Sequence, residues 1–207
     1  MEKGLYFEPS SNLFALTTLF ALFPFRWEKS PDAAGNELKL GWRWTALLSK
    51  YPELEKALFS ASLSQEEPGA YPATWRRFIR VGTSLPEEVA NLFELCHEKG
   101  YEQVIFAETI CAALTEERLD AFLQAAGRCD IALMPAGDGS VLMLSMPMHL
   151  FPEWEFFRFH AAGSVVEILS ECHSRNLSYE LAEGLDLQAA NKELSALLEK
   201  TKKPESY

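Results

Sequence analysis

The sequence predicts an α/β fold: a single three-layer domain in which a mostly parallel, mixed central sheet is covered by helices on both faces. Two observations predict it. From residue 85 onward, short apolar runs alternate with amphipathic segments across short links, which is typical of strands and helices taken in turn. The chain has 207 residues, 48% of them hydrophobic, and this suits residues 1–207 as one domain.

The clearest element is a helix over residues 85–99. Pro86 suits the first helical position, two glutamates follow it, and Gly100 supplies the stop. Apolar residues recur there at helical spacing: Val89, Leu92, Phe93 and Cys96. The next apolar run, residues 103–107, predicts a strand that is buried on both faces.

Strand and helix continue to alternate after this run. Thr115 is expected to cap a helix whose inner stripe includes Leu119 and Phe122. Two strands, over 130–134 and 141–146, flank a turn with the sequence PAGDG, and their closeness predicts a hairpin within a mixed sheet. The remaining elements are a helix over 164–175, a strand over 177–181 and a final helix over 187–198.

The first 84 residues carry weaker signals. They predict a strand over 5–7, a buried helix over 12–23, a strand over 38–44 with alternating leucines and tryptophans, and a helix over 52–60 opened by Pro52. The apolar run 13–25 is shorter than the ~20 residues of a bilayer span, so no membrane span is expected. Its flanks also lack the features of a secretory signal.

Composition narrows the function classes. The formal net charge is −11, and the basic residues are spread along the chain, so we expect no nucleic-acid partner. Four scattered cysteines in a chain that needs no disulfides indicate a reducing, cytoplasmic location. The chain contains no zinc-finger spacing, no nucleophile elbow and no complete phosphate-binding glycine motif.

Three local patterns have both a structural and a functional interpretation. In the pairs Cys96-His97 and Cys172-His173, neighbouring side chains point about 100° apart on a helix, which favours a core cysteine beside a surface histidine. The cluster Trp75-Arg76-Arg77-Phe78-Ile79-Arg80 favours an edge strand over an anion site. Gly137-Asp138-Gly139 is either a plain type I′ hairpin turn or the lip of a ligand crevice at the carboxyl end of a strand.

Aromatic residues are abundant and clustered. The chain has 14 Phe, 5 Trp and 6 Tyr, with dense groups at 13–27, 42–44 and 151–159. Each group holds more rings than one helical stripe can bury, so part of this surface is expected to lie at an interface. This predicts a homodimer that forms through an aromatic surface.

The order of motifs over residues 82–198 resembles a bacterial glycosyltransferase-like family of the nucleotide-diphospho-sugar transferase superfamily, which has the GT-A fold. The resemblance rests on Leu114-Thr115, Pro135-Ala136, Asp138-Gly139 and Asp186, which stand where the family has its G-S-D-x-P-x-L-T, P-A-x-D-G-G and closing acidic motifs. Residues 1–81 are divergent. The resemblance implies a GT-A-like domain that binds a sugar nucleotide or another small molecule.

The departures from the family pattern concern the charges that bind a nucleotide diphosphate. Ile110 stands where the family has its metal-binding aspartate, and a hydrocarbon cannot ligate Mg²⁺ or Mn²⁺. Glu108 lies two residues earlier and would project to the same side of a strand. The family's basic N-terminal loop has no counterpart, because no Lys or Arg occurs between Gly4 and Phe25.

The site predicted from this resemblance centres on Asp138 as the catalytic candidate. The ligand-binding candidates are Gly137, Gly139, Glu108, His160 and Asp186. We expect a transferase-like protein with a degenerate metal and diphosphate site, no cofactor, and weak or no transferase activity. The alternative is an active glycosyltransferase or nucleotidyltransferase that uses an activated sugar-nucleotide donor together with Mg²⁺ or Mn²⁺.

Overall fold

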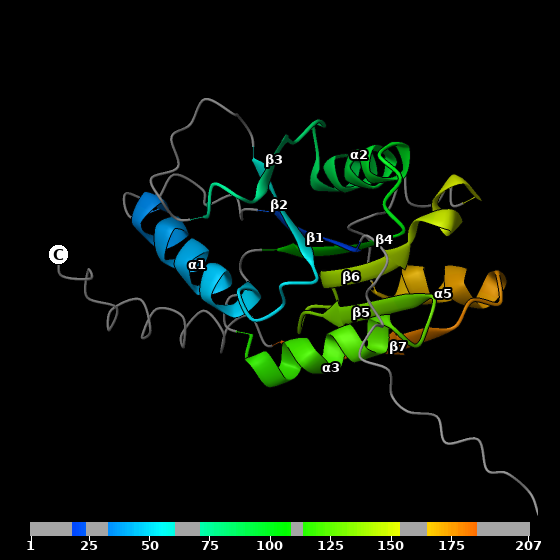
Figure 1. The fold of residues 1–207 in the computed structure, drawn as a ribbon. Helices are drawn as coiled ribbons and strands as arrows, with labels where there is room; N and C mark the ends of the chain where they lie inside the picture. Colours follow the sequence, from blue (N-terminus) through cyan, green and yellow to red (C-terminus); the bar gives the residue numbers. More distant parts are fainter. Residues whose placement is uncertain (1–17, 24–32, 61–70, 109–113, 154–164, 186–207) are drawn as a thin grey trace, which may run out of the picture.

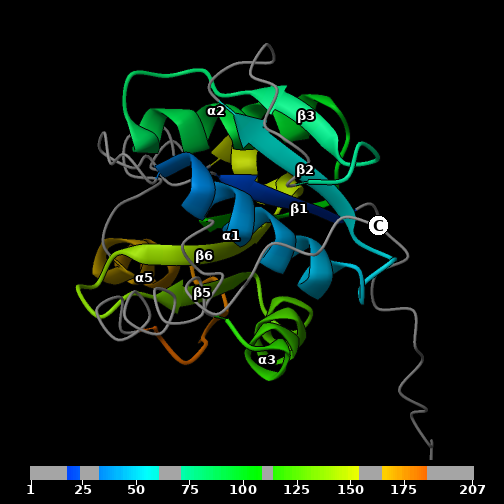
Figure 2. The ribbon, with the colours of Figure 1, turned by 90° about the vertical axis from the view of Figure 1, so that its left-hand side faces the viewer.

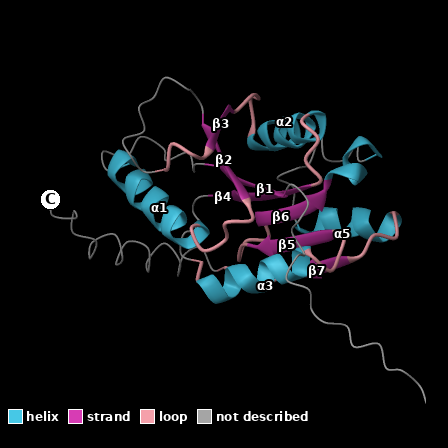
Figure 3. Ribbon diagram, in the orientation of Figure 1, coloured by secondary structure: helices cyan, strands magenta, loops and turns pink. Residues whose placement is uncertain are grey.

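A computed structural model describes residues 18–23, 33–60, 71–108, 114–153 and 165–185. Its strands form one open seven-stranded sheet in the order β3-β2-β1-β4-β6-β5-β7 (Figures 1 and 3). The strands are β1 (Thr18–Phe23), β2 (Glu55–Ser60), β3 (Arg76–Ile79), β4 (Gln103–Glu108), β5 (Ile131–Pro135), β6 (Val141–Pro147) and β7 (Tyr179–Leu181). The helices are α1 (Ala33–Leu48), α2 (Leu85–Glu98), α3 (Glu116–Ala126), the 3₁₀ helix η2 (Met148–Glu153) and α5 (Val165–Ser174).

The predicted α/β class with a mixed sheet is confirmed. Every neighbouring strand pair is parallel except the two that involve β6, which runs antiparallel to both β4 and β5. The hairpin between β5 and β6 is therefore confirmed, and β6 lies between β4 and β5. None of the described helices is long and apolar enough to cross a membrane.

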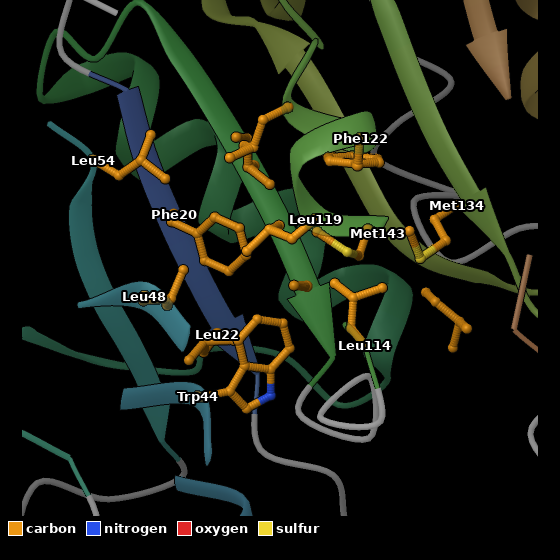
Figure 4. Close-up of a cluster of buried hydrophobic side chains, with 14 of the residues drawn as sticks. Phe20, Leu22, Trp44, Leu48, Leu54, Leu114, Leu119, Phe122, Met134 and Met143 are labelled. Atoms are coloured by element: carbon orange, nitrogen blue, oxygen red, sulfur yellow. The ribbon is translucent and has the colours of Figure 1, made fainter. Parts of the chain in front are cut away.

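Helices lie on both faces of the sheet (Figure 2). A cluster of buried hydrophobic side chains lies against each face. On one face, α1 and α3 contribute Trp44, Leu48, Leu119 and Phe122, which pack around Phe20 of β1 (Figure 4). On the other face, α2, η2 and α5 pack on the alternate residues of the same strands. Because successive residues of a strand point to opposite faces, central strands need apolar residues at every position.

The helix predicted over 12–23 is wrong in the part that the structure describes, because residues 18–23 form the strand β1. It pairs with β2 and β4 in parallel register, and Leu19, Phe20, Ala21 and Leu22 are all completely buried. A short, continuous apolar run has the same appearance whether it is a buried helix or a central strand, because periodicity is lost when both faces are covered.

Two further predictions in this region are wrong. Residues 38–44 lie in α1, where Leu40, Trp44 and Leu48 recur every four residues and are buried together on one side. The alternation of leucine and tryptophan over 38–44 arises by chance, and the helical stripe is the pattern that the fold uses. The helix predicted over 52–60 is also wrong, because residues 55–60 form β2. The last four residues of β2 are buried, since both faces of the sheet are covered there.

The second half of the chain follows the prediction closely. Ser84 and Thr115 cap α2 and α3, and each accepts a hydrogen bond from the backbone N–H three residues later. Gly100 ends α2 with φ of 76°. The predicted helix over 164–175 is α5, and the strand over 177–181 is β7. The strand predicted over 5–7 and the helix predicted over 187–198 lie outside the described residues.

The arginine cluster forms an edge strand, as predicted. β3 lies at one end of the strand order. Arg76 lies over the ring of Tyr101 on the α2 face, and Arg77 lies over the ring of Tyr71 on the α1 face. The side chain of Arg80 is 7% exposed and pairs with Glu88 of α2. The arginines therefore hold β3 against the neighbouring layers.

Candidate functional site

Six of the seven strands end on the same side of the molecule, which we call the carboxyl end of the sheet. β1, β2, β3, β4, β5 and β7 run in one direction, and β6 starts where they finish. Glu108 is the last residue of β4, and the segment 136–140 links β5 to β6. In open α/β sheets ligands bind at this end, so the predicted site lies in the expected place.

The turn that carries Asp138 is tightly bonded within itself. The N–H of Ala136 donates to Ser140 O at 2.8 Å, and the N–H of Gly139 donates to Ala136 O at 3.0 Å. Gly139 has φ of 84°, whereas Gly137 and Asp138 do not have positive φ. These are the features of a type I turn followed by a left-handed glycine, and not of the type I′ turn considered above.

Neighbouring segments hold the same turn from two sides. Leu185 donates its N–H to Pro135 O and accepts the N–H of Gly137, both at 3.0 Å. Val165, the first residue of α5, donates its N–H to Gly139 O at 3.0 Å. The N–H groups of Gly137 and Gly139 thus already donate to protein carbonyls, which leaves any ligand contact at this turn to the side chain of Asp138.

Asp138 and Glu108 form the centre of the site. The Asp138 carboxylate is fully exposed, and its Oδ1 accepts from the Ser140 hydroxyl at 2.7 Å and from the Ser140 N–H at 2.9 Å. These hydrogen bonds lower the pKa of Asp138, because they favour the ionised form. Burial, and then the charge of Asp138, raise the pKa of Glu108 to about 7. The structure therefore brings these two predicted residues close enough to interact.

Two of the predicted site residues, His160 and Asp186, lie outside the described residues, and so does Ile110, which stands in place of the family's metal-binding aspartate. Asp186 directly follows Leu185, which bridges Ala136 in the turn. Within the described ranges, no group of three or more His, Cys, Asp or Glu side chains is arranged to hold a metal ion.

The cysteine–histidine pairs behave as the sequence predicts. Cys96 and Cys172 are buried free thiols, and the adjacent His97 and His173 are exposed. Burial raises the pKa of Cys96 to about 12 and that of Cys172 to about 11, so neither is a ready nucleophile.

Two residues that position the site were missed by sequence analysis. Ser140 holds the Asp138 carboxylate, and the D-G-S order was a usable signal because a short acidic side chain commonly accepts from the residue two positions on. Gly184 allows the chain to approach the turn: a Cβ there would lie 2.8 Å from Pro135 O. Nothing in the local sequence indicates this second contact.

No protein-family model matches the chain, and no curated protein matches it. Solved structures do. One is a Desulfovibrio desulfuricans protein that is named as a nucleotide-diphospho-sugar transferase. It superposes with a TM-score of 0.62 at 12% identity over 88% of this chain and 97% of its own. The chain has the nucleotide-diphospho-sugar transferase fold.

Two cytidylyl-transferring enzymes have the same fold. A 4-diphosphocytidyl-2C-methyl-D-erythritol synthase from Anaerococcus prevotii gives a TM-score of 0.59 at 11% identity over 90% of this chain and 100% of its own. The CMP:2-keto-3-deoxy-manno-octonic acid synthetase, solved with CTP, gives 0.54 at 10% identity over 90% and 100%. The resemblance noted in the sequence is thereby confirmed at the level of the fold.

Proposed function

We propose that the chain is a nucleotide-diphospho-sugar transferase-like protein that binds a sugar nucleotide or a related small molecule at the carboxyl end of its sheet, with weak or no transferase activity. The observation that carries this proposal is the pair formed by Glu108 and Asp138. Both carboxyl groups lie at the carboxyl end of the sheet, where open α/β sheets bind their ligands, and the pKa of Glu108 is about 7.

The charges around this pair disfavour a bare diphosphate. The helices that begin nearby carry glutamates in their first turns: Glu87 and Glu88 in α2, Glu116 and Glu117 in α3, and Glu167 in α5. These side chains occupy part of the favourable field that a helix N-terminus offers to an anion. Arg80 and Arg118 pair with Glu88 and Glu183, respectively. Among the residues that the structure describes, a diphosphate would therefore meet more negative than positive charge.

Glu108 and Asp138 fit a divalent cation only in part. Mg²⁺ commonly takes one or two carboxylates together with phosphate oxygens of a substrate. With a pKa of about 7, Glu108 is only partly ionised at neutral pH, which weakens it as a ligand. In its neutral form Glu108 instead donates a hydrogen bond, and a sugar hydroxyl or carbonyl oxygen is a suitable acceptor.

The second candidate is an active transferase, and the same pair favours it. A general base works best when its pKa lies near the operating pH, and Glu108 meets that condition. Its partner Asp138 has a lowered pKa, and neighbouring carboxyl groups with separated pKa values are a usual basis for acid and base roles. In this case Glu108 would accept the proton of an acceptor hydroxyl.

Thermal-shift measurements with CDP-, UDP- and GDP-sugars test the proposal, each with and without Mn²⁺ at pH 6.5 and pH 8.5. A ligand at 100 times its dissociation constant stabilises the fold by about 2.7 kcal/mol. We expect stabilisation that does not require Mn²⁺ and that Asp138→Asn abolishes. Glu98→Gln, the same loss of charge at an exposed position at the C-terminal end of α2, should leave it unchanged.

A transfer and donor-hydrolysis assay on the same samples separates the two candidates. Turnover that depends on Mn²⁺, rises between pH 6.5 and pH 8.5 and disappears in Glu108→Gln would establish the active transferase. Absence of any nucleotide-dependent stabilisation would refute both.

A further inference from the structure

A cavity lies at the side of the sheet opposite to Asp138, which we call the amino end. Its volume is about 600 Å³, within the range of about 300 to 1,000 Å³ usual for small-molecule sites. The start of β4, the end of β6 and the C-terminal ends of α2 and α3 enclose it. Its walls include Tyr101, Gln103, Gly127, Cys129, Met148 and His149.

Gln103 presents an acceptor in this pocket. Its amide nitrogen donates to Ala126 O at 3.0 Å and to Ser145 Oγ at 2.9 Å. A backbone carbonyl can only accept, so the nitrogen must be on that side, and both of its hydrogens are used. The carbonyl oxygen of Gln103 is the atom of this side chain that is left for a ligand. A ligand must then supply a donor.

The surrounding backbone also favours a donor or a cation. α2 and α3 pack on opposite faces of the sheet, yet the C-terminal ends of both reach this pocket. Helix C-termini carry partial negative charge. The last turn of α3 has no basic residue, and that of α2 has only His97. No lysine or arginine lies within either last turn, although Lys99 caps α2 and Arg128 follows the cap of α3.

Among the residues that line the pocket, Glu102 carries a carboxylate and none is a lysine or an arginine. The exposed carboxylate of Glu102 lines the pocket. Lys99, which caps α2, lies 5.8 Å from the ring centre of Phe78 in β3, and Arg128 pairs with Glu180 of β7 at 2.7 Å. These two cations are held outside the pocket lining. The imidazoles of His97 and His149 line it and can each accept or donate a hydrogen bond.

We propose that the amino-end pocket binds a small molecule with an aromatic or apolar body and a cationic, donor-rich head such as an amidine or an amine. The side chains of Tyr101, Pro147 and Met148 offer apolar wall, and Gln103 and Glu102 offer the acceptors. The pocket is formed at the other end of the strands from Asp138, so this proposal is independent of the proposed function.

Three ligands of one shape test the sign of the charge: benzamidine (cation), benzamide (neutral) and benzoate (anion). Titration followed by ¹⁵N–¹H spectra should show saturable shifts at Gly100 and Gly127 for benzamidine. Benzoate should bind at least ten-fold more weakly. Glu102→Gln should weaken benzamidine by about two- to five-fold, the size of an exposed ion pair, and Glu117→Gln, an equal charge change outside the pocket lining, should not.

A blocking variant provides the second arm of the test. Gly127 has φ of −84° and ψ of −7°, which any residue adopts, so Gly127→Phe adds a side chain beside the pocket without backbone strain. Benzamidine shifts should disappear in this variant while the amide signals of β1 and β5 stay in place. Equal binding of benzamidine and benzoate, shifts centred elsewhere, or full binding to Gly127→Phe would each overturn the proposal.

Discussion

The two ends of the sheet contrast in how they carry negative charge. At the carboxyl end, helices begin, so the backbone field is favourable to anions, but the side chains of Glu108, Asp138 and the first-turn glutamates oppose it. At the amino end, helices finish, and the backbone field and Glu102 have the same sign. The contrast shows that a βα topology sets the field at each end, while side chains decide whether a ligand experiences it.

The largest expected effect concerns Glu108. Its pKa in the folded protein is about 7, against 4.5 for a free side chain, so the folded state binds the proton more tightly than the unfolded state. The free energy of unfolding therefore falls as the pH rises from about 4.5 through 7. Glu108→Gln removes this titration. We expect the variant to be more stable than the wild type by up to about 3 kcal/mol at pH 8 and equal to it near pH 4.5.

Urea denaturation of both proteins between pH 4.5 and pH 8.5 provides the measurement. Glu98→Gln, at an exposed position at the end of α2, serves as a control for a general effect of net charge. The free-energy difference between Glu108→Gln and wild type could instead be constant across this pH range. That result would show that the pKa of Glu108 is not raised, and the contrast between the two ends would lose its main support.

The next effect concerns the close approach at Gly184. An added Cβ would lie 2.8 Å from Pro135 O and 3.1 Å from Pro135 Cγ, so the chain must move away from the turn. Gly184→Ala should cost about 1 to 3 kcal/mol, as overpacking usually does. Chemical shifts of Asp138 and Ser140 should change as well, whereas those of Gly100 and Gly127 should not. Shifts confined to Gly184 itself would show that the turn is held without this contact.

A smaller effect is expected at the amino end. The hydroxyl of Tyr101 donates to Glu55 Oε1 at 2.6 Å. This bond connects the loop before β4 to the first residue of β2. Tyr101→Phe should cost about 1 kcal/mol, the net value of one hydrogen bond. Thermal unfolding of Tyr101→Phe, Glu55→Gln and the double variant measures the coupling. Simple additivity of the two single effects would exclude this bond as a contributor.

The smallest effect sharpens the pairing of Glu108 with Asp138. Because the charge of Asp138 contributes to the raised pKa of Glu108, Asp138→Asn should lower that pKa, although burial will keep it above the usual range. Carbonyl ¹³C shifts of Glu108 recorded against pH measure it directly. An unchanged pKa would mean that the two carboxyl groups are electrostatically separate, and the site would then rest on Asp138 alone.

The amphipathic elements of the second half were predictable because their signals are local. Ser84, Thr115 and Gly100 mark helix ends within a few residues of the stripes they limit. β1 and β2 lack such signals: their residues are apolar because neighbours cover both faces, and those neighbours come from distant parts of the chain. The error around Trp44 has a different origin: Leu40, Trp44 and Leu48 recur every four residues, a local signal of a helix that the shorter alternation of leucine and tryptophan obscured.

The position of Asp138 in the fold was predictable, whereas the electrostatics around it were not. Pro135 and the two glycines of the turn indicate a strand end, and that placed Asp138. The raised pKa of Glu108 depends on burial and on the carboxylate of Asp138 in the turn between β5 and β6, and no spacing rule contains either quantity. The amino-end pocket was not predicted, because it is made from helix ends and strand starts whose residues carry no motif.

The strand order divides the sheet at one line. β3, β2 and β1 come from residues before 80, and β4, β6, β5 and β7 come from residues after 102, so the six residue pairs between β1 and β4 are the junction of two sequence-contiguous halves. This arrangement suits a split protein. We expect co-expressed fragments 1–81 and 82–207 to assemble through the β1–β4 line, with copurification as the readout, because a break before Gly82 interrupts no strand. Charged substitutions at Phe20 and Ile105, which face each other across that line, should then prevent assembly.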